Sequence, residues 1–314
     1  MLTNRRAQRD VITLKAIFPS LRFVAVTPED WCEAVAGADA IFLGRGIAVD
    51  DVLAQAPKLR WIQTEGAGVD RALTERLRRS DVVLTNSSGV HGIPIAEHVL
   101  ALILAFAREL PALGRAQARH TWEKPQREIF ELEGQTLAVI GLGAIGLILA
   151  RKAHGLGLRV LGLRRYPDTN KPDFVERLFG SDELDSALEQ ADHVAICLPL
   201  TDATRGLFNA TRFARMRPGS YIYNIGRGAI IDSTALQEAL ASGHLAGAGL
   251  DVTDPEPLPP TSSLWDDPRA IITNHTSGGS SKNPDRTLEI FRDNISRAIS
   301  GKPLRNVIDK LEGY

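Results

Sequence analysis

The most constraining feature of this 314-residue sequence is a glycine pattern that directly follows a short apolar segment. Residues 136–140 read Thr-Leu-Ala-Val-Ile, which is typical of a strand buried on both faces, and a G-x-G-x-x-G pattern and an apolar helix pattern follow. In this arrangement the first glycine permits a tight turn, the second lets a pyrophosphate approach the backbone, and the third lets the helix pack closely on the strand. Because the N–H groups at the start of the helix suit phosphates, the pattern predicts a dinucleotide site that includes Gly141, Gly143, Ala144, Ile145 and Gly146.

The residues that would choose the cofactor are two arginines at the end of the next predicted strand, 158–163. In dinucleotide-binding proteins an acidic residue at this place binds the ribose 2′-hydroxyl of NAD. This sequence has Arg164 and Arg165 instead, and guanidinium groups suit the dianionic 2′-phosphate of NADP. We therefore predict that NADP(H) is favoured and that NAD(H) is possible. The alternative is that both arginines lie in a solvated loop.

Composition and charge exclude several classes of protein. Hydrophobic residues make up 44% of the chain and charged residues 24%, as in globular proteins, and a net charge of −1 argues against a nucleic acid or a membrane surface as partner. The longest apolar run, 99–107, is too short to cross a bilayer. The first residues lack the apolar segment of a signal peptide, so we expect a cytoplasmic protein. Cys32 and Cys197 form no metal or disulfide pattern, and we expect both thiols to be buried and inert.

Residues 1–90 predict a separate α/β domain, because apolar strand patterns alternate with helical ones and the glycine fingerprint is absent. The predicted strands are 23–26, 40–43, 61–63 and 82–85, and the predicted helices are 28–36, 49–56 and 70–79. One strand end carries Thr-Glu-Gly-Ala-Gly-Val-Asp at 64–70, and adjacent backbone N–H groups in such a loop suit a carboxylate. The alternative is a tight turn with Asp70 as a helix N-cap. A strongly apolar helix at 95–110 is expected between the two domains.

The second half of the chain continues the alternation of strands and helices, with strands expected at 193–197, 220–225, 245–251 and 270–273. In an open parallel sheet the carboxyl ends of the strands face one crevice, so residues that follow different strands should converge there. Within this set, Thr204 could bind a phosphate or ribose and Asp251 could hold the nicotinamide carboxamide. The residues expected beside the cofactor in this half are Leu198, Pro199, Thr204, Ile225, Gly226, Arg227, Asp251 and His275.

Three ionisable residues at strand ends, Arg227, Glu256 and His275, suggest a reaction. Hydride transfer between a nicotinamide and a carbonyl carbon needs a proton donor for the developing alkoxide, and His275 suits this role. It also needs a positive group that polarises the carbonyl and holds a carboxylate, which suits Arg227. Glu256 could accept the second imidazole N–H, which fixes the tautomer and favours the imidazolium. Each residue alone could be an ordinary polar loop residue. The other histidines lack metal-ligand spacing, so no metal is expected.

Together these motifs resemble the D-isomer-specific 2-hydroxyacid dehydrogenase family over nearly the whole chain. The motifs are Gly-Ala-Gly-Val-Asp ending at 70, Ala-Glu-His ending at 98, Gly-Leu-Gly-Ala-Ile-Gly ending at 146, Asn-Ile-Gly-Arg-Gly ending at 228, Leu-Asp-Val-Thr-Asp-Pro-Glu-Pro-Leu ending at 258 and Asn-His ending at 275. The resemblance implies an α/β fold of two Rossmann-like or flavodoxin-like parallel-sheet domains with the active site in the cleft between them, and a homodimer. The implied domains are residues 1–94 with 283–314 for substrate binding and residues 95–282 for NAD(P) binding.

The resemblance also implies roles for single residues. The catalytic set would be Arg227, Glu256 and His275, and the substrate-binding set Ala67, Gly68, Arg227 and His275, with the amides of the first two on the substrate carboxylate. Arg164 and Arg165 look like those of the NADPH-dependent glyoxylate/hydroxypyruvate reductase branch. The sequence departs from many members at Asn274, where proline is frequent, and in the Thr-Ser-Gly-Gly run after His275. Which 2-keto acid is bound would depend on these departures and on Arg45, Ser87 and Ser88.

Three functions follow from these observations. The first is NADP(H)-dependent reduction of a small 2-keto acid to the D-2-hydroxy acid. The second is an NAD-linked dehydrogenase of the same fold for a larger or phosphorylated acid. The third is a dinucleotide-sensing binding protein similar to the family's corepressor branch, which would bind cofactor without useful turnover.

Overall fold

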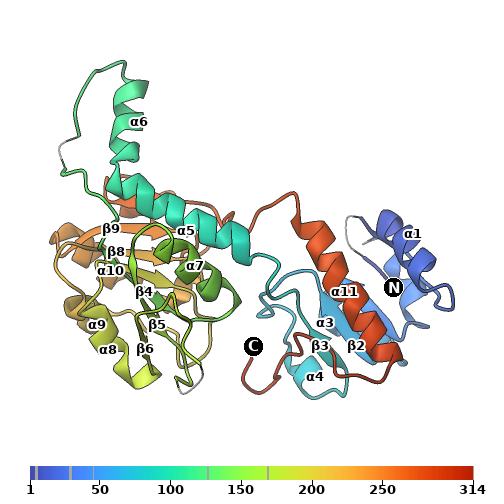
Figure 1. Ribbon diagram of the computed structural model, residues 1–314. Helices are drawn as coiled ribbons and strands as arrows, with labels where there is room; N and C mark the ends of the chain where they lie inside the picture. The colour runs from blue at the N-terminus through green and yellow to red at the C-terminus, as the bar shows by residue number, and fades with distance from the viewer. Residues whose placement is uncertain (4–5, 28–29, 45, 126, 168–169, 314) are drawn as a thin grey trace. The chain divides into compact units, whose positions relative to one another are not determined.

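The computed structural model describes residues 1–3, 6–27, 30–44, 46–125, 127–167 and 170–313. The chain divides into two compact units (Figure 1): residues 1–91 with 280–314 form unit 1, and residues 92–279 form unit 2. These boundaries lie three residues before the expected ones, 94/95 and 282/283. The first boundary coincides with the start of helix α5 (Gly92–Ala107), which begins three residues earlier than the expected helix.

Unit 1 contains a three-stranded parallel sheet in the order β1-β2-β3. Its strands are β1 (Ala40–Leu43), β2 (Trp61–Thr64) and β3 (Val83–Thr85), and its helices are α1 (Ala7–Ile17), α2 (Trp31–Val35), α3 (Val49–Gln55), α4 (Glu75–Arg78) and α11 (Asn283–Ile299). The ring of Phe291 in α11 stacks on Phe42 of β1, with centroids 4.7 Å apart, and tilts against Trp61 of β2 at 5.2 Å. The two ends of the chain therefore share one apolar core. Of the helix expected at 28–36 the structure shows α2, and residues 28–29 lie outside the described residues.

Two expectations for the N-terminal region are wrong, and one helix there was missed. The strand expected at 23–26 is reduced to one bridge between Ala25 and Leu2, because only a short segment of chain pairs with it. Helix α1 was not predicted. The helix expected at 70–79 is shortened to α4, because Thr74 is its N-cap: Thr74 Oγ1 accepts a hydrogen bond from the Leu77 amide at 3.2 Å.

Unit 2 contains a seven-stranded parallel sheet in the order β10-β9-β8-β7-β4-β5-β6. Its strands are β4 (Thr136–Ile140), β5 (Arg159–Leu163), β6 (Arg177–Phe179), β7 (His193–Ile196), β8 (Ser220–Asn224), β9 (Leu245–Leu250) and β10 (Ala270–Ile272). Because β4 pairs with both β5 and β7, the order of the strands reverses beside it, and ligands of such sheets bind beyond the carboxyl ends at this point. Strand β6 was not predicted, since it lies in a polar segment.

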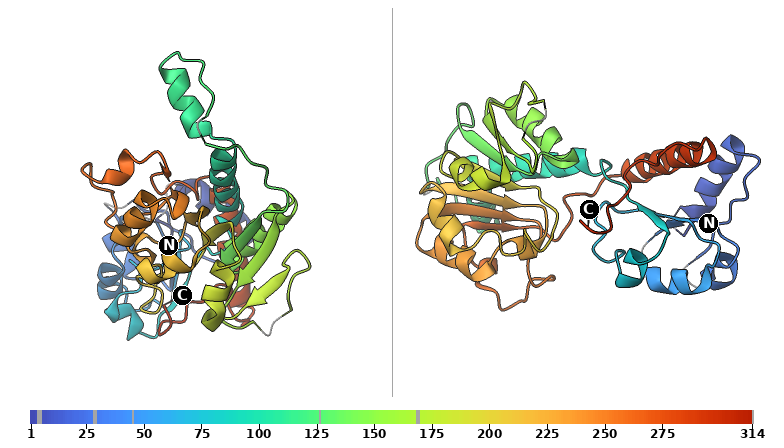
Figure 2. Two further views of the ribbon diagram at one scale, coloured as in Figure 1. Left: turned by 90° about the vertical axis from the view of Figure 1, so that its left-hand side faces the viewer. Right: turned by 90° about the horizontal axis from the view of Figure 1, so that it is seen from below.

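Helices cover both faces of this sheet (Figure 2). Helices α5 and α7 (Ala144–His154) share one apolar core with the sheet, and α8 (Leu184–Leu188), α9 (Ala210–Arg215) and α10 (Ser233–Ala241) share the other. Helix α5 approaches β9 closely because Gly247 and Gly249 leave room for it. A Cβ at Gly247 would lie 2.8 Å from the Phe106 ring, and one at Gly249 would lie 3.0 Å from Leu102 Cδ1.

Helix α6 (Leu110–Ala118) extends away from the sheet of unit 2 (Figures 1 and 2) and was not predicted. Short 3-10 helices occupy Ser181–Glu183, Gly228–Ile230 and Ser263–Trp265. Among the helices of the described residues, none is both long and apolar enough to cross a membrane. The protein thus has an α/β fold with two parallel sheets, as the sequence predicts.

Candidate active site

The glycine loop between β4 and α7 follows the predicted geometry. Gly141 has a φ of +107°, which favours glycine, and a Cβ there would lie 2.9 Å from the carbonyl oxygen of Cys197. A Cβ at Gly146 would overlap the carbonyl oxygen of Gly141, which confirms the close packing expected at Gly146. A Cβ at Gly143 would meet nothing within 4 Å among the described residues, and α7 begins at the next residue. The start of α7 therefore has room for an anion beside its N–H groups.

Arg164 and Arg165 lie at the carboxyl end of β5, where the sequence places them. The Arg164 amide donates to the carbonyl oxygen of Phe179 at 3.1 Å, which ties the start of this loop to β6. Arg165 is exposed, and its guanidinium carbon lies 5.6 Å from the centroid of the Tyr166 ring. Residues 168–169 of the same loop lie outside the described residues. Contact between either arginine and a 2′-phosphate stays a prediction.

The loop after β7 is closed by its own hydrogen bonds. Thr204 Oγ1 donates to the carbonyl oxygen of Pro199 at 2.7 Å and accepts from the Thr201 amide at 2.8 Å. The carbonyl oxygen of Leu198 lies against Gly226, where a Cβ would be 2.6 Å away. Thr204 therefore shapes the turn that presents Leu198 and Pro199, and its contact with a phosphate or ribose stays a prediction.

A buried asparagine organises the turn that carries Arg227. Asn224 is fully buried at the end of β8. Its Oδ1 accepts from the Gly226 amide at 3.1 Å, and its Nδ2 donates to the carbonyl oxygen of Arg227 at 2.9 Å. These two bonds fix the backbone on both sides of Gly226. Asn224 had been named only as part of the Asn-Ile-Gly-Arg-Gly motif, with no role, although a polar residue at the end of an apolar strand, two positions before a glycine, was an available signal.

Glu256 and His275 are brought together by the fold. His275 Nδ1 lies 2.7 Å from Glu256 Oε1, and the side chains are 50% and 43% exposed, respectively. Because a carboxylate only accepts, Nδ1 carries the hydrogen of this bond, and Nε2 is the atom left for proton exchange with a ligand. His275 has a φ of +55°, which is strained for a residue with a side chain. Such a conformation persists only where the surrounding structure holds it.

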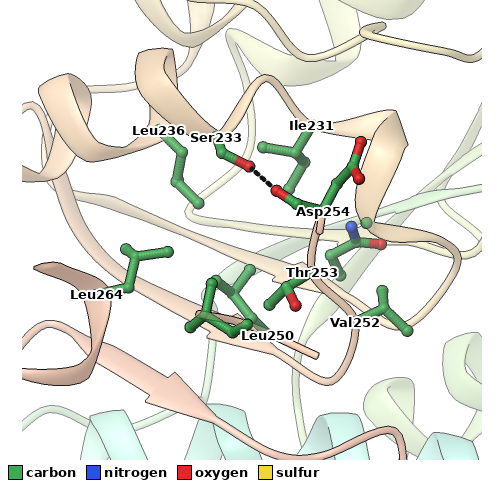
Figure 3. A pocket seen from close by; sticks show the side chains of 11 residues that line it. Ile231, Ser233, Leu236, Leu250, Val252, Thr253, Asp254 and Leu264 are labelled. Carbon is green, nitrogen blue, oxygen red and sulfur yellow. Dashed lines mark hydrogen bonds between the residues drawn. The ribbon is translucent and has the colours of Figure 1, made fainter. Parts of the chain in front are cut away.

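The segment before Glu256 packs on the turn of Arg227. A Cβ at Gly228 would overlap the carbonyl group of Thr253, so glycine is required for this approach. From the other side, Ser233 Oγ at the start of α10 donates to the carbonyl oxygen of Asp254 at 3.0 Å, as Figure 3 shows. A small pocket beneath this bond is lined mainly by apolar side chains, among them Ile231, Leu236, Leu250, Val252 and Leu264. The loops of Arg227 and Glu256 are thereby held against each other.

Asp251 is the centre of the loop that carries His275. Its side chain is 1% exposed: Oδ1 accepts from Thr273 Oγ1 at 2.6 Å and from the Thr276 amide at 3.0 Å, and Oδ2 accepts from the Ser277 amide at 3.1 Å. Its main-chain oxygen accepts from the His275 amide at 2.8 Å. Burial alone would raise the pKa of Asp251, but the hydrogen bonds from Ser277, Thr273 and the amides together outweigh it and lower the pKa below its usual value. The carboxylate is thus engaged within this loop, and its predicted contact with a nicotinamide carboxamide stays a prediction.

In unit 1, the loop after β2 presents two backbone amides. The amides of Ala67 and Gly68 have no acceptor among the described residues. The carbonyl oxygens of the loop are bound, because the Ser87 amide donates to Gly66 at 3.0 Å and Asn86 Nδ2 donates to Ala67 at 2.6 Å. The loop is therefore fixed with N–H groups available, as an anion site requires. Asn86 was not singled out from the sequence.

Several expectations stay predictions and one is corrected. The cleft between the units is untested, and Arg45 lies outside the described residues. In the described part of the chain, no three His, Cys, Asp or Glu side chains are grouped to hold a metal ion. Cys32 is exposed on the short helix α2, so the expectation that both thiols are buried is wrong for it. Cys197 is half-buried, and burial of its thiol raises the pKa to about 12.

Comparison with known proteins places this geometry in a family. A family model described as D-isomer specific 2-hydroxyacid dehydrogenase, NAD binding domain, matches residues 100–277. D-3-phosphoglycerate dehydrogenase of Mycobacterium bovis is 33% identical over 274 residues, which are 86% of this chain but 51% of that protein, so the chain spans about half its length. Glyoxylate/hydroxypyruvate reductase B of Pectobacterium carotovorum is 33% identical over 98% of this chain and 94% of that protein. The crystal structure of an NADPH-dependent glyoxylate/hydroxypyruvate reductase from Sinorhizobium meliloti, in complex with NADP and sulfate, has a TM-score of 0.84 and 29% identity and covers 100% of this chain and 98% of that one.

The parallel sheet with its glycine loop and the neighbouring histidine–glutamate pair define a protein of the dinucleotide-binding dehydrogenase class. Within that class, the chain belongs to the D-isomer-specific 2-hydroxyacid dehydrogenase family. The resemblance found in the sequence is therefore confirmed.

Proposed function

We propose that this chain catalyses the NADP(H)-dependent reduction of a small 2-keto acid, such as glyoxylate or hydroxypyruvate, to the D-2-hydroxy acid. The observation that carries the proposal is the hydrogen bond between His275 and Glu256, at the carboxyl edge of the sheet that also bears the glycine loop. A histidine with one nitrogen held by a carboxylate and the other accessible is suited to give a proton to a developing alkoxide. The names of the relatives from Pectobacterium carotovorum and Sinorhizobium meliloti support the substrate class.

The glycine loop fits a dinucleotide, because the backbone at Gly143 has open space beside it at the start of α7. When bound, the nicotinamide cofactor supplies the hydride. Arg164 and Arg165 would hold a 2′-phosphate, which favours NADP(H) over NAD(H), and the relative from Sinorhizobium meliloti binds NADP in its crystal structure. Leu198, Pro199 and Ile225 would line the cofactor from the neighbouring strand ends.

The residues of this chain would transfer the proton, polarise the carbonyl and bind the substrate carboxylate. His275 Nε2 gives a proton to the carbonyl oxygen of the substrate, while Glu256 keeps the Nδ1 hydrogen and the ring in place. Arg227 polarises that carbonyl and binds the substrate carboxylate through two N–H donors. The amides of Ala67 and Gly68 bind the same carboxylate. In this assignment unit 1 is the substrate-binding domain and unit 2 is the NAD(P)-binding domain.

A second candidate is an NAD-linked dehydrogenase for a larger or phosphorylated acid. It is supported by the identity of 33% to D-3-phosphoglycerate dehydrogenase. The two candidates differ in cofactor and in the size and charge of the substrate, so one set of rate measurements separates them.

We also propose that the chain acts in the cytoplasm as a homodimer through the α6 region. Trp122 is completely exposed, and Leu110 and Leu113 of α6 are 54% and 37% exposed. Such apolar exposure on a projecting helix favours contact with a second copy. Light scattering of the purified protein should give twice the chain mass, and Trp122→Ser should shift it toward the monomer. A monomeric wild type would contradict this part of the proposal.

The deciding experiment measures initial rates with NADPH and with NADH, each with glyoxylate, hydroxypyruvate, pyruvate, phenylpyruvate and, in the oxidative direction, 3-phosphoglycerate. We expect turnover of a small 2-keto acid with a clear preference for NADPH. Arg164→Asp should reduce that preference, because it removes a donor to the 2′-phosphate and introduces a like charge. A preference for NADH with 3-phosphoglycerate would establish the second candidate instead.

Variants of the proposed site provide the mechanistic control. Arg227→Ala and His275→Ala should each lower kcat by about 10²- to 10⁴-fold, the range for lost acid–base or electrostatic catalysis. His154→Gln, at an exposed position of α7, should behave as the wild type. Full activity in either active-site variant would refute the assigned mechanism, and cofactor binding without any turnover would favour a dinucleotide-sensing protein.

A further inference from the structure

His98 of α5 reaches the hydrogen bonds around Asp251 from a separate element of unit 2. Its Nε2 atom lies 3.0 Å from Thr273 Oγ1 and 3.9 Å from Asp251 Oδ1. The side chain is 21% exposed, so most of it lies within the protein. The proposed reaction gives His98 no role.

The direction of these hydrogen bonds follows from which groups can donate. An ionised carboxylate only accepts, so the Thr273 hydroxyl donates its single hydrogen to Asp251 Oδ1 at 2.6 Å. Thr273 Oγ1 then offers His98 only lone pairs. His98 Nε2 must therefore carry a hydrogen and donate it, which gives a directed series from His98 through Thr273 to Asp251.

The carboxylate at the end of this series holds the backbone on which His275 stands. The side chain of Asp251 accepts the amides of Thr276 and Ser277, and its main-chain oxygen accepts the amide of His275. Asp251 thus binds three consecutive amides of a segment in which His275 has a strained φ of +55°. A shift of Asp251 would move His275 relative to Glu256.

Helix α5 holds His98, the hydrogen-bond donor, in a fixed position relative to the sheet. It packs on β9 through Leu102 and Phe106, one and two turns after His98, against glycines that leave no spare room. Strand β9 ends directly before Asp251. The helix that carries His98 and the strand that delivers Asp251 are therefore in direct contact, which fixes the distance that the hydrogen bonds span.

We propose that His98 is a positioning residue: by donating to Thr273 it orders the Thr273–Asp251 pair and, through that pair, the loop that aims His275 at Glu256. This inference rests on the proposed function, because it explains how the acid–base residue of that function is held. His98 acts through other residues and does not touch the substrate.

The test compares two substitutions of His98. Gln places an amide N–H close to the position of imidazole Nε2, whereas Leu has similar bulk and no donor. The control is Glu97→Gln on the same helix, which removes a surface ion pair with Lys152 (3.1 Å) but leaves the Asp251 hydrogen bonds intact. For each protein, kcat and KM are measured with the 2-keto acid that the wild type reduces with the highest kcat/KM, and the Kd of NADPH is measured separately.

We expect His98→Leu to lower kcat about 5- to 30-fold, the effect of one or two lost hydrogen bonds, with the Kd of NADPH unchanged. His98→Gln should recover kcat to within about threefold of the wild type, because one donor replaces another. Glu97→Gln should match the wild type. Unchanged kcat in His98→Leu, or equal losses in the Leu and Gln variants, would overturn the proposal, because the donated hydrogen would then not matter.

A second readout does not depend on turnover. Amide hydrogen exchange of residues 275–277 in the cofactor-free protein should be about 5- to 30-fold faster in His98→Leu than in the wild type or in His98→Gln. If the wild type reduces no 2-keto acid, the proposed function fails, while the exchange rates still decide whether His98 orders this loop. If His98→Leu does not fold, Thr273→Val and Thr273→Ser replace it: Val should accelerate exchange and Ser should not. Equal exchange in those two variants would overturn the proposal.

Discussion

Glu256 Oε1 and His275 Nδ1 lie 2.7 Å apart although 19 positions separate the two residues in the sequence. Glu256 follows β9 and His275 follows β10, and these parallel strands are neighbours in the sheet. Their carboxyl ends therefore meet at the same edge, and the two loops need to extend only a short way to bring carboxylate and imidazole together.

The negative charge of Glu256 is expected to contribute to kcat beyond the hydrogen bond that its oxygen accepts. Glu256→Gln keeps an oxygen that can accept the Nδ1 hydrogen of His275 but removes the negative charge, which weakens a charge-assisted bond by about 1–2 kcal/mol. The expected result is a kcat lowered about tenfold, with the Kd of NADPH unchanged, since about 1.4 kcal/mol corresponds to a factor of ten. Initial rates and fluorescence titration measure both quantities. A wild-type kcat would show that the pair has no part in the reaction.

Gly228 is expected to tolerate no side chain. Gly228→Ala would place a methyl group into the carbonyl of Thr253, so the backbone before Glu256 must move. Overpacking of this kind destabilises a protein by about 1–3 kcal/mol. The movement should also displace Glu256 from His275 and so lower kcat. Gly114→Ala is the matched control, because nothing lies within 4 Å of a Cβ at that glycine among the described residues. Urea unfolding and initial rates are the measurements, and equal behaviour of the two variants would contradict the contact.

His193 is expected to make unit 2 sensitive to mild acid. The residue is fully buried, with Nδ1 3.1 Å from the Tyr223 hydroxyl, and burial lowers its pKa from 6.5 to about 4. The unfolded chain thus binds a proton at a higher pH than the folded chain. The stability due to the neutral ring is fully present above about pH 6.5 and is lost as the pH falls toward 4. At 1.36 kcal/mol per pKa unit, this loss is of the order of 3 kcal/mol.

The matching measurement is the free energy of unfolding in urea between pH 7 and pH 4. His193→Phe keeps an aromatic ring beside Tyr221 but cannot titrate. Its unfolding free energy should fall less steeply with decreasing pH than that of the wild type, whatever the absolute stability. Parallel curves would exclude His193 as the source of acid sensitivity.

The two cysteines are expected to differ in reactivity. Cys32 is exposed, whereas burial raises the pKa of the Cys197 thiol to about 12 and leaves almost no thiolate near neutral pH. A disulfide reagent at pH 8 should therefore label one thiol of the native protein quickly and the second only after denaturation. Cys32→Ser should abolish the fast reaction. Two fast thiols in the native wild type would contradict the structure.

The sequence predicted those parts of the site that depend on local pattern and on sheet topology. The glycine loop is local in sequence: it lies in one strand–turn–helix segment, and Gly146 packs against Gly141 and Val139 of that segment, although Gly141 also lies close to Cys197. The meeting of Glu256 and His275 followed from a topological rule, because loops after neighbouring parallel strands share an edge. The strands of unit 2 were found, except β6, because buried parallel strands are continuous apolar runs.

The sequence could not predict hydrogen bonds between side chains that are far apart in the chain and belong to no recognisable motif. Thr273 and His98 lie 175 positions apart, and neither an isolated threonine nor a histidine on an apolar helix indicates the other. Helix α1 was missed although its buried residues Ala7, Val11 and Leu14 have helical spacing, so the signal was present in the sequence. Helix α6 was missed because only Ala116 of it is buried, which leaves no apolar face for a periodic pattern to mark. The strand expected at 23–26 failed for the opposite reason, since an apolar run forms a strand only where a partner of equal length pairs with it.

The shared core of the two chain ends bears on how the protein is made. Unit 2 is continuous in sequence, so its residues leave the ribosome one after another, but the core of unit 1 lacks Phe291 until the segment that follows unit 2 has been synthesised. During translation the rings of Phe42 and Trp61 are without their final partner for as long as unit 2 takes to emerge. Unit 1 is therefore completed only after unit 2 has been synthesised, and it is the unit that most needs protection from aggregation in the meantime.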